Sequence, residues 1–170
     1  ARQVYRWIHR RGVTDLACMT DLGRQLRERL AAGFVIGAPR LAARETSSDG
    51  TQKFLLELRD GKRIESVFIP DTPAMTFCIS SQVGCTMDCT FCSTAQQGFN
   101  RNLETAEIVG QVWLANRELG YSPDGDRVIT NVVFMGMGEP LANYEPVVEA
   151  IRILRDELGL NLGARRITVS

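Results

Sequence analysis

The sequence contains little histidine, little lysine and no long apolar run. His9 is its single histidine, so imidazole can supply at most one ligand to a metal site. Apart from Lys53 and Lys62, the basic residues are arginines, which suit bidentate contacts to phosphate but also follow from codon bias. No apolar stretch approaches the roughly 20 residues that span a bilayer, and the first residues carry charges throughout, unlike a secretory signal peptide. We therefore expect a cytoplasmic protein without a membrane segment.

The composition is that of an ordinary globular protein. Of the 170 residues, 44% are hydrophobic and 24% are charged, and neither low-complexity segments nor internal repeats occur. Because the sequence begins with Ala1, we expect it to be part of a longer chain. Residues 1–45 are basic and residues 46–170 are acidic, although the formal net charge is zero. This asymmetry indicates either a polyanionic partner or a solvated helical surface.

The cysteines are few and crowded. There are 5, and all except Cys18 lie between residues 78 and 92. A secreted disulfide framework would spread its cysteines more evenly, so this pattern favours a metal site in a reducing compartment.

The first part of the chain reads as two helices followed by a small antiparallel sheet. Helical spacing of apolar residues predicts helices over 2–10 and 22–32, the second with Asp21 as N-cap and Gly33 just past its end. Short apolar runs after turn signals predict a meander of strands at 41–47, 53–58 and 63–69. Pro70 and Pro73 then suggest a boundary. We expect an accessory domain over 1–72, helical over 1–35 and β over 36–72, and a second domain over 73–170.

The second part alternates strands and helices. We expect strands at 74–80, 127–136 and 166–170, a helix over 105–119 capped by Thr105, and a helix that runs from Asn143 to Gly159. Such units predict an α/β fold with a parallel sheet, either a barrel or an open sheet. Sites in these sheets lie at the carboxyl ends of the strands. The cysteine loop and the segment 136-GMGEP-140 both follow a predicted strand.

The segment 84-GCTMDCTFCSTAQQGF-99 carries the most specific signal. Cys85, Cys89 and Cys92 have the spacing C-x3-C-x2-C. Thiolates suit zinc or iron–sulfur clusters, and a structural zinc site requires four protein ligands. Three local cysteines fit a 4Fe–4S cluster whose fourth iron is open to a bound molecule. The alternative is a zinc site that Cys78 or His9 completes.

The stretches 78-CISSQVGCTMDCTFCSTAQQGFNRNL-103 and 134-FMGMGEPLANY-144 resemble the dual-specificity RNA methyltransferase family RlmN, of the radical S-adenosylmethionine (SAM) superfamily. The segments 3-QVYRWIHRRG-12 and 61-GKRIESVFIP-70 are similar to that family's accessory domain, so the resemblance covers nearly the whole chain. It implies a partial (β/α) barrel of radical-SAM type, cut after about three strands. It also implies that the three loop cysteines hold a 4Fe–4S cluster, and that Gly138, Glu139 and Ser170 contact SAM. Alone, the G-E-P segment would read as an ordinary turn.

Two further roles follow from the same resemblance. Glu65 corresponds to a proton-accepting glutamate, and Cys78 to a cysteine that resolves a covalent enzyme–RNA intermediate by forming a disulfide with a methyl-carrying cysteine. From the residues alone, Glu65 shares a strand face with Val67 and Ile69, and either face of that strand could be the buried one. Cys78 alone could be a small buried hydrophobe, and Cys18 a packing residue.

The family methylates C2 of an adenine in 23S ribosomal RNA and in transfer RNA. An adenine C2 is electron-poor, so a radical route through the cofactor is needed there. The resemblance implies an electron donor such as flavodoxin, and we expect a monomer. Arg101 and the arginine-rich helices could contact phosphates. The alternatives are a C8-adenine methyltransferase of the antibiotic-resistance branch and a non-catalytic, zinc-stabilised RNA-binding module. Because no methyl-carrying cysteine occurs up to Ser170, we expect residues 1–170 alone to be inactive.

Overall fold

A computed structural model describes residues 1–71 and 74–170. Its helices are α1 (Arg2–His9), α2 (Arg24–Gly33), α3 (Ser93–Gln96), α4 (Thr105–Glu118) and α5 (Tyr144–Arg155). Its strands are β1 (Arg40–Thr46), β2 (Gln52–Glu57), β3 (Arg63–Asp71), β4 (Ala74–Cys78), β5 (Gln82–Gly84), β6 (Phe99–Asn102), β7 (Asn131–Phe134) and β8 (Ile167–Val169). The predicted mixed α/β class is confirmed.

The described strands form one large sheet and a short hairpin. The large sheet has the order β1-β2-β3-β4-β7-β8, and β5 pairs with β6. Strands β1, β2 and β3 are antiparallel neighbours, as the predicted meander requires. β4 pairs antiparallel with β3, which was not predicted, and β4, β7 and β8 run parallel to one another. Helix α4 connects β4 to β7, and α5 connects β7 to β8. The predicted boundary between residues 72 and 73 lies outside the described residues, so the division into two domains stays a prediction.

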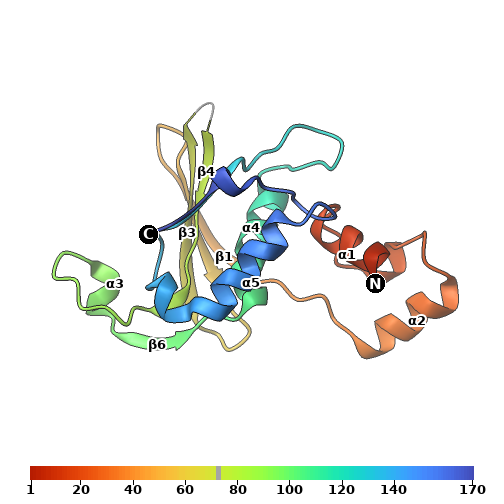
Figure 1. Cartoon of the computed structure of the whole chain (residues 1–170), viewed down its shortest axis with the longest axis horizontal. Helices are drawn as coiled ribbons and strands as arrows, with labels where there is room; N and C mark the ends of the chain where they lie inside the picture. The colour runs from red at the N-terminus through yellow and green to blue at the C-terminus, as the bar shows by residue number, and fades with distance from the viewer. Residues whose placement is uncertain (72–73) are drawn as a thin grey trace.

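Helices α4 and α5 lie side by side across one face of the large sheet (Figure 1). Between them and the sheet lies the main hydrophobic core, to which β2, β3, β4 and β7 all contribute. Phe54 and Phe77, on β2 and β4, are fully buried there and meet edge to face. Burial of such aromatic side chains contributes a large part of the stability of a core. Within the part of the chain that the structure describes, the opposite face of the sheet carries no such helical layer (Figure 1).

A smaller core holds the N-terminal helices together. Leu16, Met19 and Leu22 are buried, and the apolar residues of α1 pack on them. This cluster is fixed to the larger body by Trp113 of α4, whose Nε1 donates to the carbonyl of Ile8 at 2.9 Å. Helices α1 and α2 consequently lie at one end of the molecule and α3 at the other (Figure 1).

The predicted helix ends were less accurate than the helices themselves. Helix α2 begins after Gly23, because the predicted cap Asp21 instead accepts a hydrogen bond from Trp7. Helix α4 is capped by Glu104, which forms a capping box with Glu107, and Thr105 is its first residue. Helix α5 ends at Arg155, four residues before the predicted stop.

Candidate iron–sulfur and cofactor site

The carboxyl ends of the parallel strands bring the predicted site segments to one edge of the sheet. β4 leads into the cysteine loop, β7 leads into the 136–140 segment, and β8 ends just before Ser170. Because the three strands are parallel neighbours, these segments lie at the same edge. Figure 1 shows α3 of the cysteine loop and the C-terminus on the same side of the molecule.

The cysteine loop is closed by a hairpin that the sequence did not reveal. Strands β5 and β6 pair on either side of residues 85–98. Gly84 has a φ of 75°, and a Cβ there would collide with the carbonyl oxygen of Gly98. The amide of Cys85 donates to that same oxygen at 3.3 Å. Only a glycine allows the two strands to approach this closely at the base of the loop.

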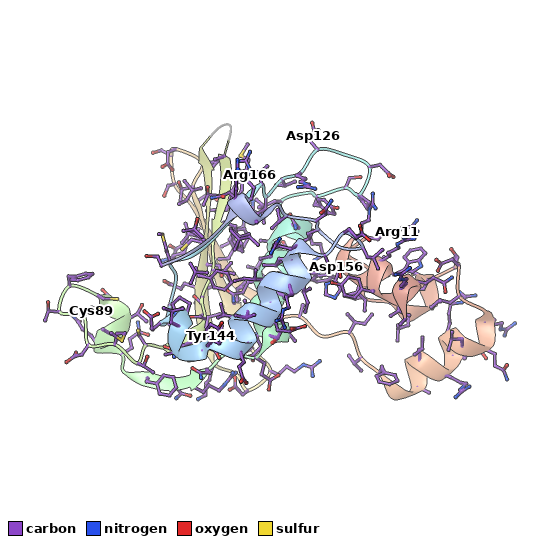
Figure 2. All side chains as sticks on the ribbon, viewed as in Figure 1. Arg11, Cys89, Asp126, Tyr144, Asp156 and Arg166 are labelled. Carbon is purple, nitrogen blue, oxygen red and sulfur yellow. The ribbon has the colours of Figure 1, made fainter. Side chains whose placement is uncertain are left out.

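The three loop cysteines are partly exposed and outside the hydrophobic core. The Cys92 amide donates to the carbonyl of Cys89 at 3.1 Å. The backbone N–H groups of Ala95 and Thr94, in the short helix α3, lower the pKa of the Cys92 thiol. A thiol with a lowered pKa is more readily available as the thiolate ligand. Figure 2 shows Cys89 in this loop, far from Arg11 at the other end of the molecule.

Within residues 1–71 and 74–170, no three side chains of His, Cys, Asp or Glu are arranged so that they could hold a metal ion. The fit to a cluster therefore rests on donor chemistry: three thiols in one exposed loop, and a thiolate-favouring environment at Cys92. His9 lies on α1, at the opposite end from α3 (Figure 1), so it is not placed to complete a zinc site with these cysteines.

The 136–140 segment is pressed against the chain that leaves β4. The Met137 carbonyl accepts the amides of Ser81 and Gln82 at 2.8 and 3.2 Å, and the Met137 amide donates to Ser80 Oγ at 2.9 Å. Gly138 has a φ of 95°, and a Cβ there would lie 2.5 Å from Gln82 Cβ. Its lack of a side chain is thus required by packing within the chain itself. The Glu139 side chain accepts from the Leu141 amide at 2.9 Å, capping the short 3-10 helix Pro140–Asn143.

Glu65 and Cys78 lie on the face of the sheet that the helices leave uncovered. The buried residues of β3 are Ile64, Ser66 and Phe68, which settles the face that sequence reasoning left open. Val67 and Cys78 are cross-strand partners, and Glu65 lies two residues from Val67, so Glu65 and Cys78 are diagonal neighbours on one face.

The two side chains differ in exposure. The Glu65 side chain is 49% exposed, and its Oε1 lies 3.6 Å from Lys53 Nζ on β2. Burial raises the pKa of the Cys78 thiol, and a hydrogen bond from the Met135 backbone only partly offsets this. Cys78 therefore stays protonated at neutral pH unless a base takes its proton.

Three other residues that the sequence analysis named have surroundings that do not by themselves indicate a functional role. Ser170 is exposed at the carboxyl end of β8. The Arg101 guanidinium is occupied within the chain, since it pairs with both oxygens of Glu107 and with Asp60, all at 2.8–2.9 Å. These contacts make it a poor candidate for phosphate. Cys18 is exposed, with its thiol 3.6 Å from Asp15 Oδ2, so the prediction that it is a packing residue was wrong.

Sequence reasoning missed the buried contacts of three polar residues near these segments, although it named Asn143 as the cap of the second helix, a position that the structure confirms. Gln111 of α4 bonds to Ser80 and Ser66. The Asn143 amide donates to the carbonyls of Ser81 and Leu103, both at 2.8 Å. Gln82 reaches both the cysteine loop and the 136–140 segment. Polar side chains at helix or strand positions otherwise read as surface residues, so no pattern in the sequence identifies them.

Two family models match the chain. The model of the ribosomal RNA large subunit methyltransferase N-terminal domain matches residues 1–36, and that of the radical SAM superfamily matches residues 79–170. Among solved structures, the chain is similar to a radical SAM methyltransferase from Sphaerobacter thermophilus, with a TM-score of 0.86 and 41% identity, over 99% of this chain and 49% of that one. The chain thus spans about half the length of that relative. Because the superfamily model matches more than half of its residues, the chain belongs to the radical SAM superfamily, and the match of the helices ahead of the sheet to the N-terminal domain model fits a member of the RlmN family.

Proposed function

We propose that the protein is a radical SAM methyltransferase that acts on RNA and methylates C2 of an adenine in 23S ribosomal RNA and transfer RNA. The observation that carries this proposal is the arrangement at the sheet. The cysteine loop, the Gly138–Glu139 turn and Ser170 share one edge, and Glu65 and Cys78 lie on the uncovered face that leads to it.

Cys85, Cys89 and Cys92 would hold a 4Fe–4S cluster, and Gly138, Glu139 and Ser170 would contact SAM. Once bound and reduced by a donor such as flavodoxin, the cluster and SAM supply the radical chemistry that an electron-poor carbon requires. The exposed loop can close around a cluster without disturbing the sheet, because none of residues 85–100 belongs to the hydrophobic core.

The chain's own residues would handle the protons and the release of product. Glu65 is exposed enough to meet a base stacked on the uncovered face, and it would accept the proton that leaves C2. The thiol of Cys78 would lose its proton and attack the sulfur that joins the RNA to the methyl-carrying cysteine. A disulfide would form as the carbon–sulfur bond to the RNA adduct breaks, and the carbon that keeps the electron pair of that bond would take up a proton to complete the methyl group. In this proposal the methyl-carrying cysteine lies outside residues 1–170.

The RNA would also contact the N-terminal helices. Residues 1–45 hold an excess of arginine over acidic residues, and Arg11 stacks over Trp7 with its guanidinium carbon 4.2 Å from the ring centroid. This surface is at the end opposite α3 (Figure 1), so an RNA that touches both must be long.

Among the residues that the structure describes, no helix has the length and apolar character for a bilayer. We expect a cytoplasmic monomer.

The test is nucleoside mass spectrometry of RNA treated with the full-length protein, reconstituted anaerobically with iron and sulfide. We expect C2-methyladenosine; C8-methyladenosine alone would assign the protein to the antibiotic-resistance branch. Cys89→Ala should abolish iron binding and product, while Cys18→Ala, an exposed cysteine away from the site, should change neither. Cys78→Ala should accumulate a covalent protein–RNA adduct, because the resolving thiol is missing.

Metal analysis separates this proposal from a non-catalytic module. Stoichiometric zinc without iron or sulfide, in protein purified and reconstituted anaerobically, would contradict a radical enzyme and favour a zinc-stabilised RNA-binding module. Residues 1–170 alone should bind iron but should not methylate RNA.

A further inference from the structure

Gln82 lies between the two segments that would hold the cluster and the cofactor. It is on β5, immediately before the cysteine loop, and its side chain is completely buried. Its Oε1 accepts the amide of Thr86 at 3.2 Å and the amide of Glu139 at 3.0 Å. Its Nε2 donates to Asn102 Oδ1 at 2.8 Å. One carbonyl oxygen thus receives backbone N–H groups from both segments.

The backbone reinforces this connection. The Gln82 amide donates to the Met137 carbonyl at 3.2 Å, and the missing Cβ of Gly138 leaves the space that the Gln82 side chain fills. Thr86 directly follows Cys85, and Glu139 directly follows Gly138. The distance between a cluster on the cysteine loop and a ligand on the Gly138–Glu139 turn therefore depends on Gln82.

We infer that Gln82 is a positioning residue, which sets the spacing between the cluster loop and the SAM-contacting turn so that one SAM molecule can reach both. This inference rests on the proposed function, because it requires that both segments bind the same cofactor. It goes beyond that function because it assigns a measurable share of the affinity for SAM to a buried amide that is not itself a ligand of the cluster or of SAM.

The physical reason is the loss of an acceptor that two segments share. Without the Gln82 oxygen, the part-buried hydrogen bonds from the N–H groups of Thr86 and Glu139 are lost, and nothing else holds both groups to one point. A bidentate ligand is sensitive to such separation, because it loses the contact at one end when the other is kept.

Gln111 provides a matched control. It is also a fully buried glutamine, and its amide makes a comparable set of bonds, to Ser66, Ser80 and the Glu107 carbonyl. None of these partners belongs to the cysteine loop or to the Gly138–Glu139 turn. Gln111 contacts the backbone of Ser80, and only the hydroxyl group of Ser80 reaches Met137, next to that turn. Gln82→Met and Gln111→Met each replace the amide by an apolar chain of similar length. Both should lower the unfolding temperature to a similar degree.

The experiment measures SAM binding to the reconstituted full-length protein by equilibrium dialysis, and the electron paramagnetic resonance spectrum of the reduced cluster with and without SAM. We expect Gln82→Met to retain iron but to raise the Kd for SAM about tenfold or more, about 1.4 kcal/mol, with a diminished spectral change on SAM addition. Gln111→Met should keep the Kd within about twofold.

Gln82→Asn covers the case in which Gln82→Met fails to fold. Its amide is one methylene shorter and cannot reach both N–H groups, so it should raise the Kd while Gln111→Asn does not. Equal Kd values for wild type and the folded Gln82 variants, or equal losses in the Gln111 variants, would overturn the inference. A wild-type protein that binds no cluster or no SAM would instead refute the proposed function itself, and the inference with it.

Discussion

Replacement of Gly138 by alanine tests whether the 136–140 segment is pressed against β5. Two separate penalties are expected. The φ of 95° is a conformation that alanine adopts with strain, at about 1–2 kcal/mol. The new Cβ would also lie 2.5 Å from Gln82 Cβ and 2.6 Å from the backbone nitrogen of Gln82. Since backbone cannot move aside as a flexible side chain can, this overpacking adds about 1–3 kcal/mol. Together Gly138→Ala should destabilise the fold by about 2–5 kcal/mol, a large share of a typical stability of about 5–15 kcal/mol.

Two other glycines separate the penalties. Gly120 has a φ of 81°, and none of the described residues comes within 4 Å of the position that a Cβ would take there, so Gly120→Ala carries only backbone strain. Gly136 has no left-handed φ, but its Cβ would lie 2.7 Å from the Ile79 carbonyl oxygen, so Gly136→Ala carries only overpacking. The Gly138→Ala cost should approach the sum of the other two.

Urea unfolding followed by circular dichroism gives the three free energies. SAM affinity of the reconstituted protein should fall in Gly136→Ala and Gly138→Ala, because both displace the segment, and stay unchanged in Gly120→Ala. A Gly138→Ala variant no less stable than Gly120→Ala would refute the close approach to Gln82. The need for glycine would then come from the cofactor rather than from the chain.

Three further predictions concern the rest of the fold. Burial lowers the pKa of His9 below its ordinary value of about 6.5, against the opposing charge of Asp156. The unfolded state therefore binds a proton at this site more readily than the folded state does. The free energy of unfolding should consequently decline as the pH falls from about 6.5 towards the pKa of folded His9. In thermal melts, His9→Gln should show a smaller decline over this range. Glu107→Ala should cost about 1–2 kcal/mol through loss of the α4 capping box, whereas Glu107→Gln, which keeps the cap and loses the charge pair with Arg101, should cost less in urea unfolding. Removal of iron by a chelator should leave the circular dichroism spectrum and melting temperature nearly unchanged and expose only residues 85–98 to proteases, because that loop lies outside the core; cooperative unfolding on chelation would indicate a structural metal instead.

The sequence predicted the large elements well because their signals are local. The periodic apolar residues of α5 and the short apolar strands of β2, β3 and β7 each show one buried face within a dozen residues. Helix α4 was also predicted from its apolar stripe, although its middle, from Ile108 to Asn116, is buried on all sides. The parallel arrangement of β4, β7 and β8 followed from the alternation of strands and helices. Because the carboxyl ends of such strands meet, the proximity of the cysteine loop and the 136–140 segment was also predictable.

Helix ends and the hairpin were not predictable in the same way. Asp21 and Thr105 are both good caps by residue type, yet tertiary contacts assign the cap to their neighbours: Trp7 takes Asp21 as an acceptor, and Arg101 and Glu104 fix Glu107. The β5–β6 pair joins short polar strands across a loop of more than ten residues. Its pairing depends on Gly84 and on contacts made only after the chain has folded.

The glycine and glutamate of 136-GMGEP-140 illustrate why a motif does not by itself reveal a role. In the structure Gly138 is required by its closeness to Gln82, and the Glu139 side chain caps a 3-10 helix through the Leu141 amide. These contacts form without any cofactor. They nevertheless hold the turn in one position at the edge of the sheet, which is what a pre-organised binding site needs. Packing and cofactor binding are therefore not competing explanations for these residues. The affinity of a SAM molecule bound here would depend on the rigidity that the chain's own contacts provide. No pattern in the sequence predicted the contacts of Gln82, and substitution of this residue measures that dependence.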